Sequence, residues 1–154
     1  MLSRSLKSVG VVLGVVGIMA ASQAPALAAQ SFDLNTDRSD GYAHAYGEVS
    51  YIDANSVYVL SYVSDRCDSA GRGDGEGAYL WLQIKYTDGS YDGPRVFLQN
   101  YDNDGCDSGY IPSSWTYDRT KRISWVRLRL DEADGPNDST PDSVLSSQKD
   151  NPYT

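Results

Sequence analysis

Residues 78–87, AYLWLQIKYT, alternate apolar and other side chains along their length, and this alternation decides the fold class. A period of two is the pattern of a β-strand with one buried face. The face expected to turn inward consists of Ala78, Leu80, Leu82, Ile84 and Tyr86. The next residues, TDGS at 87–90, have the composition of a turn. The stretch therefore predicts a strand that ends in a tight turn.

Similar short runs occur on both sides of this strand, and no stretch keeps a helical period over three turns. The further strands are predicted at residues 42–51, 56–63, 95–101, 115–117 and 123–131. The run at 56–63 is apolar or aromatic on both faces, which favours a central position. Short strands of this kind predict an all-β fold, as a single small antiparallel β-sandwich that is immunoglobulin-like or related. An open β-barrel is the alternative.

The N-terminus has the three parts of an export signal. Arg4 and Lys7 are basic, residues 9–21 are apolar, and Ala26-Leu27-Ala28 resembles a signal-peptidase site. The apolar run is shorter than the ~20 residues that span a bilayer, so we expect residues 1–28 to be removed rather than kept as an anchor. The sequence predicts a secreted, extracellular protein that begins near Ala29 and has no membrane attachment after cleavage.

The charge balance excludes one class of partner. The 154-residue chain has a formal net charge of −8, and loss of Arg4 and Lys7 would leave 11 basic side chains against 21 acidic ones. Binding of nucleic acid depends on basic clusters that neutralise phosphates, so nucleic acid is not an expected partner.

The remaining chain divides by composition into three parts. Residues 29–40 are expected to be a flexible N-terminal segment, and residues 41–131 form the predicted β-sandwich domain. Residues 132–154 are rich in Asp, Ser and Pro with few apolar side chains, which indicates a loosely held tail. The first segment is long enough to add a strand to a partner.

Two cysteines remain after cleavage, Cys67 and Cys106, and an oxidising compartment favours a disulfide between them. Each cysteine is followed by Asp-Ser. Each also follows a predicted strand, and in an up-and-down meander these two strands would end at the same end of the sheet. A bridge over a loop of this length should stabilise the fold by roughly 4 kcal/mol.

The two cysteine loops, DRCDSAGRGDGEG and YDNDGCDSGY, are acidic and glycine-rich. If the disulfide joins them, their carboxylates crowd together, and calcium would relieve the repulsion with oxygen ligands. Solvated turn residues chosen for backbone reasons are the alternative. The EF-hand spacing is not met. The candidate calcium ligands are Asp68, Asp74, Asp102, Asp104 and Asp107.

No catalytic residues are proposed from the sequence. His44 is the only histidine, so any Ser-His-Asp or Cys-His arrangement would depend on it alone, and a polar strand face is its expected place. One histidine and two paired cysteines are too few ligands for a usual zinc site. Acidic residues are too numerous for a glycosidase pair to be recognised. We expect a protein that is not an enzyme and needs no cofactor, calcium aside.

Aromatic and arginine side chains with outward parity are the candidate binding surface, because such residues dominate protein interfaces and flat rings also stack on sugars. The alternative is that a second sheet or the tail covers them. The residues are Tyr79, Trp81, Trp125, Arg127 and Arg129.

Three strings suggest a family: GAYLWLQIKYTDGSYDGP at 77–94, RISWVRLRLD at 122–131 and DNPY at 150–153. Together with the export signal, they resemble the small exported β-sandwich proteins of actinobacteria, especially streptomycetes. Many of those proteins have further cysteines near the C-terminus, whereas this chain has none after Cys106. The chain also resembles, more weakly, the adaptor subunits of umbrella-shaped antibacterial toxin particles. That likeness implies an extracellular protein partner and no residue roles.

The leading hypothesis is therefore a secreted, non-enzymatic protein-interaction module, such as a subunit or adaptor of an extracellular complex. The first alternative is a carbohydrate- or cell-wall-binding protein, with or without calcium. The second alternative is a small secreted hydrolase.

Overall fold

The computed structural model describes residues 29–36, 41–67, 71, 75–93, 97–103, 109–139 and 141–154. Within these ranges the chain forms β-strands and no helix. The strands are β1 (Gln30–Asn35), β2 (Gly41–Tyr51), β3 (Ser56–Cys67), β4 (Gly77–Tyr86), β5 (Phe97–Asp102), β6 (Ile111–Asp118), β7 (Ile123–Ala133), β8 (Asp142–Leu145) and β9 (Lys149–Asp150).

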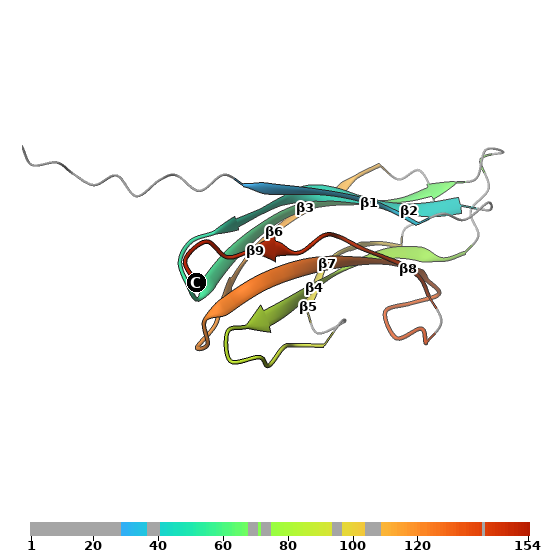
Figure 1. Cartoon of the computed structure of the whole chain (residues 1–154). Coiled ribbons are helices and arrows are strands. Elements are labelled where there is room, and N and C mark those ends of the chain that lie inside the picture. The colour runs from blue at the N-terminus through green and yellow to red at the C-terminus, as the bar shows by residue number, and fades with distance from the viewer. Residues whose placement is uncertain are drawn as a thin grey trace, which may run out of the picture.

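These strands form two antiparallel sheets, seen as two layers in Figure 1. The first sheet has the order β1-β2-β3-β6, and β3 is central in it, as its two apolar faces predicted. The second has the order β5-β4-β7-β8, and β9 pairs with Trp125 and Val126 near the start of β7. The sheets are not closed into a barrel. The all-β class and the two-layer arrangement of a sandwich are thus confirmed.

The core lies between the sheets and consists of side chains that alternate along the strands. In β4 the whole predicted inner face, from Ala78 to Tyr86, is buried. Leu80 is paired with Leu130 of β7, and both side chains are fully buried. Ala43, Ala45 and Val49 cover the core from β2. The predicted parity of β4 is therefore confirmed, and β2 buries alternate residues in the same way.

The two open sides of the sandwich are bridged by polar contacts. On one side the Lys149 amine donates to the Ser31 carbonyl at 2.7 Å, and the Gln30 amide donates to the Asp150 carbonyl at 2.9 Å. On the other side Asn100 of β5 donates to the Ile111 carbonyl of β6 at 2.6 Å. These contacts join the first sheet to the second at both margins.

The two terminal segments are more ordered than their composition predicted. Residues 30–35 form β1, whose Phe32 and Leu34 enter the core, in a stretch expected to be flexible. Residues 142–145 and 149–150 form β8 and β9 in the expected tail. In each case pairing with a longer neighbouring strand satisfies the backbone, so few apolar side chains suffice.

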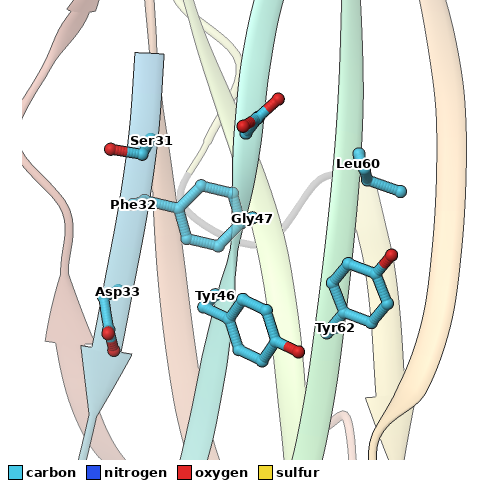
Figure 2. A pocket seen from close by; sticks show the side chains of 8 residues that line it. Ser31, Phe32, Asp33, Tyr46, Gly47, Leu60 and Tyr62 are labelled. Atoms are coloured by element: carbon cyan, nitrogen blue, oxygen red, sulfur yellow. The ribbon is translucent and has the colours of Figure 1, made fainter. Parts of the chain in front are cut away.

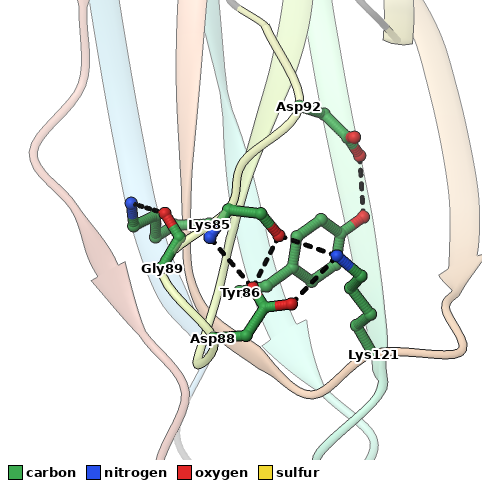
Figure 3. A network of polar contacts seen from close by, with 7 residues as sticks. Lys85, Tyr86, Asp88, Gly89, Asp92 and Lys121 are labelled. Atoms are coloured by element: carbon green, nitrogen blue, oxygen red, sulfur yellow. Dashed lines mark hydrogen bonds and ion pairs between the residues drawn. The ribbon is translucent and has the colours of Figure 1, made fainter.

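The turn predicted after β4 is present. Gly89 has φ of 87° and donates its backbone N–H to the Tyr86 carbonyl at 3.1 Å. The Asp88 carboxylate lies 2.9 Å from the amine of Lys121, as Figure 3 shows. It also accepts a hydrogen bond from the Ser90 hydroxyl at 2.6 Å. The hydrogen bonds from Ser90, and then the contact with Lys121, hold the Asp88 pKa well below its usual value.

The ends of β3 and β5 meet, although they belong to different sheets. The backbone N–H of Asp65 donates to the buried carboxylate of Asp102 at 3.1 Å. The two cysteine loops therefore begin at neighbouring strand ends. These ends are close because β3 and β5 meet across the two layers, and not because they are alternate strands of a single meander. Cys67 is the last residue of β3, and its backbone is paired with Gly41 of β2. Its side chain and all of Cys106 lie outside the described residues, so the disulfide stays a prediction.

Candidate functional site

A groove opens on the outer face of the first sheet, across β1, β2 and β3 (Figure 2). Its volume is about 430 Å³. That volume lies in the usual range for pockets that hold small molecules. The lining residues are Ser31, Phe32, Asp33, Tyr46, Gly47, Glu48, Leu60 and Tyr62.

The groove arises from the alternation of its three strands. The residues of β2 at 43, 45 and 49 point into the core, so Tyr46 and Glu48 point outward. Leu60 and Tyr62 have the same outward parity in β3. Gly47 adds no side chain to the floor, and the ring of Phe32 lies beside it, as Figure 2 shows.

A cluster of aromatic rings forms one end of the groove. Tyr46 and Tyr62 face each other across the strand pair and stack, with ring centroids 4.9 Å apart and planes at 12°. The ring of Tyr110 meets Tyr46 edge to face at 5.0 Å. Edge-to-face and offset pairs of this kind are favourable beyond the area that they bury. The rings are therefore held in place by one another.

His44 links this cluster to β1. Its Nε2 lies 2.9 Å from an Asp33 oxygen, and its Nδ1 lies 2.6 Å from the Tyr110 hydroxyl. In the tautomer that donates Nε2–H to Asp33, Nδ1 accepts from Tyr110. Arg66 donates to the same hydroxyl at 2.7 Å, and its guanidinium lies 4.7 Å from the centre of the Tyr110 ring. Both nitrogens of the only histidine thus have partners at the groove's end.

The groove is acidic. Asp33 and Glu48 bring two carboxylates to it, and the Asp33 side chain is 71% exposed. No lysine or arginine of the described chain is among the lining residues. The potential of the groove is therefore negative, which disfavours anions.

The predicted binding residues of β4 have outward parity but are buried. Tyr79 and Trp81 are 4% and 7% exposed and form a small cluster with Ala133. Tyr79 also stacks on Tyr101 at 6.2 Å. The indole N–H of Trp81 has no hydrogen-bond partner. Parity could not reveal this burial, because neighbouring strands of the same sheet cover the rings.

The predicted binding residues of β7 are partly exposed and already paired. Arg127 donates to the Gln83 carbonyl oxygen at 2.9 Å and lies 5.5 Å from the Trp125 ring. These residues line a hollow of about 230 Å³ with Lys85 and Tyr91. Arg129 donates to the buried Asp131 at 2.6 Å. The five predicted surface residues thus lie on one sheet face, in two different environments.

Of the candidate calcium ligands, only Asp102 belongs to the described chain, where its carboxylate accepts the Asp65 N–H. The other four lie outside it: Asp68, Asp74, Asp104 and Asp107. Among the residues that the structure places, no three His, Cys, Asp or Glu side chains gather in a way that could hold a metal ion. The two-loop calcium site remains a prediction.

The margin of β6 is a second exposed feature. β6 has eight residues and stands at the end of the first sheet. Trp115 shares the parity of Ser113 and Tyr117, which contact Gln99 of β5, yet Trp115 is 58% exposed. Between residues 114 and 117, no hydrogen bond within the described ranges reaches the β6 backbone except those of its ladder with β3.

The sequence did not single out the groove or Trp115. The groove depends on which strands are neighbours, and outward tyrosines of β2 and β3 are ordinary in a sheet. Trp115 was expected only in a short strand. The signal that could have found it is the absence of charge from Ile111 to Tyr117.

Comparison of the chain with protein-family models, curated proteins and solved structures finds no match. The resemblance to small exported actinobacterial proteins thus remains an expectation. In the part of the chain that is described, no helix is long and apolar enough to cross a membrane.

Proposed function

We propose that this chain is a secreted, non-enzymatic protein-interaction module that binds an extended segment of a partner along β6. The observation that carries the proposal is the stretch 114–117 of β6, where no hydrogen bond between described residues reaches the backbone outside the β3 ladder and where Trp115 is exposed. Addition of a strand to a sheet edge supplies main-chain hydrogen bonds, and side-chain pockets or anchors supply specificity. An exposed tryptophan is a frequent anchor of protein interfaces.

The other margins of the described sheets are protected. β1 is covered by β9, because Lys149 of β9 bonds to Ser31 and Gln30 of β1 bonds to Asp150. β8 has only four residues. β5 pairs with β4 through a register shift at Leu80/Trp81. Proteins blunt exposed edges by coverage, shortness, bulges or charge. Among the described residues, β6 has Pro112 near its start and contacts from Asn100 and Gln99 of β5, and none of these contacts reaches the backbone between 114 and 117.

The chemistry of β6 defines the segment that fits it. Ser114 and Thr116 have small outward side chains, and no charge occurs between Ile111 and Tyr117. A partner strand with an apolar side chain against Trp115 and uncharged neighbours would pair there without desolvating a charge. The export signal supports an extracellular partner, and the role of an adaptor subunit in a complex is the most specific form of this proposal.

The test is capture of partners from the medium of the producing cells, with tagged wild-type protein and matched variants. Thr116→Lys places a charge on the β6 margin, and Thr87→Lys adds the same charge in an exposed turn on the other sheet. Trp115→Ala removes the anchor. The expected result is a partner retained by the wild type and Thr87→Lys and lost from the other two.

Hydrogen exchange gives the position of binding. The amides between residues 114 and 117 that point away from β3 should become protected when the captured partner is added, because a new strand would occupy the free side. A partner that binds Thr116→Lys and Trp115→Ala as well as the wild type would contradict the proposal. So would a protein that stays monomeric and captures nothing.

A further inference from the structure

We infer that the groove across β1, β2 and β3 binds an organic ammonium group. This site lies on the outer face of the sheet and is independent of the proposed partner strand at β6. Two aromatic rings, from Tyr46 and Tyr62, line it together with two carboxylates. Rings and carboxylates together are the usual surroundings of a bound organic cation.

The charges of the groove favour a cation over other ligands. Asp33 and Glu48 are its only ionised lining residues, and both are acidic. One oxygen of Asp33 is 2.9 Å from His44, and the side chain still exposes most of its surface. Arg66 lies behind Tyr110, outside the lining, where it contacts that ring and hydroxyl. A positive group would therefore meet attraction from both sides of the floor.

The polar groups of the groove suit an ammonium better than a neutral sugar. Besides the two carboxylates, its side chains carry only the hydroxyls of Ser31, Tyr46 and Tyr62. None of the lining side chains is an amide, a guanidinium or an amine. For a sugar, these three hydroxyls would be the only side-chain donors among the lining residues, whereas a quaternary ammonium needs only a negative potential and an apolar surface.

The rings are positioned before any ligand arrives. Tyr46 is held between Tyr62 on one side and the edge contact of Tyr110 on the other, and His44 anchors Tyr110. A binding surface that is already rigid loses little conformational entropy when it is occupied. The floor of the groove is closely packed as well. β2 and β3 approach so closely at Gly47 that a side chain there would overlap the Leu60 carbonyl.

The test compares choline with its uncharged isostere, 3,3-dimethylbutan-1-ol, by two-dimensional NMR titration of the full protein at low salt. Choline should shift the amide signals of Ser31, Gly47 and Tyr62 in a saturable way, and the isostere should not. Glu48→Gln should weaken choline binding by about 2- to 5-fold, the effect of one exposed charge pair. Asp134→Asn, the same neutralisation at an exposed site outside the groove, should leave it unchanged.

A second variant separates aromatic from purely electrostatic attraction. Tyr62→Leu keeps the groove apolar and both carboxylates present, and it should weaken choline binding by about 3-fold or more. The inference would be overturned if Tyr62→Leu bound choline with unchanged affinity while Glu48→Gln and Asp134→Asn lost choline affinity equally. That result would show only diffuse charge attraction. Equal binding of the isostere, binding of methyl glucoside in place of choline, or no saturation up to about 50 mM choline would also overturn the inference.

Two sources could supply the ammonium group, and further probes distinguish them. Acetyl-lysine amide with its free side-chain amine, and acetyl-arginine amide, represent basic side chains of a protein. Choline represents a free quaternary ammonium or a lipid headgroup. Saturation by choline at the groove amides supports the site, and the affinity of the lysine and arginine probes relative to choline states the source.

Discussion

Gly47 occupies a position in β2 where a side chain has no room. A Cβ built there would lie 2.0 Å from the Leu60 carbonyl oxygen and 3.0 Å from the ring of Phe32. The first of these neighbours is backbone of the central strand and cannot move alone. The residue therefore fixes how closely β2 and β3 approach at the floor of the groove.

Gly47→Ala should destabilise the protein by about 1–3 kcal/mol, because overpacking forces the strand pair apart. Gly135→Ala is the matched control, since nothing lies within 4 Å of a Cβ there and its φ is not in the left-handed region. The control should change the free energy of unfolding by less than about 0.5 kcal/mol. Urea unfolding of both variants gives the measurement. Equal midpoints for the two would contradict this account of Gly47.

At this scale the sequence predicted which side chains point inward more reliably than which are exposed. Parity placed Leu82 and Leu128 in the core, and both are fully buried. Parity also placed Trp81 outward, where the structure buries its ring. Alternation reports the face of a sheet, whereas exposure depends on the neighbours of that face, which only tertiary structure supplies.

At the scale of elements, β5 and β6 belong to different sheets and are joined through Gln99 and Tyr117. The Tyr117 hydroxyl donates to the Gln99 side-chain oxygen at 2.9 Å, and its ring packs on Phe97 at 5.5 Å. Burial raises the pKa of Tyr117 to about 12, and the nearby Arg119 opposes the shift only in part. The neutral phenol thus belongs to the closed margin of the sandwich.

A raised pKa gives the direction of a pH effect. An unfolded tyrosine ionises near pH 10, so the stability associated with neutral Tyr117 is complete below pH 10 and is lost as the pH rises through about 12. Tyr86, whose pKa burial also raises to about 12, acts in the same direction. The melting temperature should fall over this window.

Tyr117→Phe tests the assignment to one residue. At neutral pH the variant should be less stable by about 1 kcal/mol, because the hydrogen bond to Gln99 is lost. The difference from the wild type should shrink between pH 10 and 12, since phenylalanine cannot ionise. Circular dichroism melts at several pH values measure this. Parallel curves for both proteins would show that Tyr117 does not titrate as described.

The long strands were predictable and the short ones were not. β2, β3, β4 and β7 have ten or more residues each; β2, β4 and β7 alternate clearly, and β3 is apolar or aromatic on both faces. β8 has four residues, of which only Val144 and Leu145 are apolar, and β9 has two. Such segments become strands because a neighbour offers hydrogen bonds. β1 does alternate, with Phe32 and Leu34 inward, but residues 29–40 were judged by composition, which did not reveal the strand.

At the scale of the whole molecule, the division of strands between two sheets could not be predicted. β6 follows β5 in sequence but joins the other sheet beside β3. The groove, the β6 margin and the meeting of Asp65 with Asp102 all depend on that division. Local pattern contains no information about it, because the pairing is decided by contacts distant in sequence.

The expected disulfide would act on the whole molecule by tying its two layers at one pole. The unreduced protein should be lighter by two hydrogen atoms than the reduced form, and reduction should lower stability by roughly 4 kcal/mol. Intact-mass measurement and unfolding with and without reductant check both expectations. The Cys67→Ser, Cys106→Ser double variant should match the reduced wild type. Alkylation of both thiols in the denatured but unreduced protein would contradict the pairing.

The contacts of Lys149 and Gln30 have a consequence for the timing of folding. A ribosome makes β1 before the other strands and Lys149 of β9 after β2 to β8, so the margin of β1 stays uncovered until all of these strands have been made. Contacts so distant in sequence form slowly. A chain with the predicted export signal would therefore stay incompletely folded for most of its synthesis. That delay is compatible with passage through a translocation channel as an unfolded chain, and β9 would fix β1 in place once it emerges.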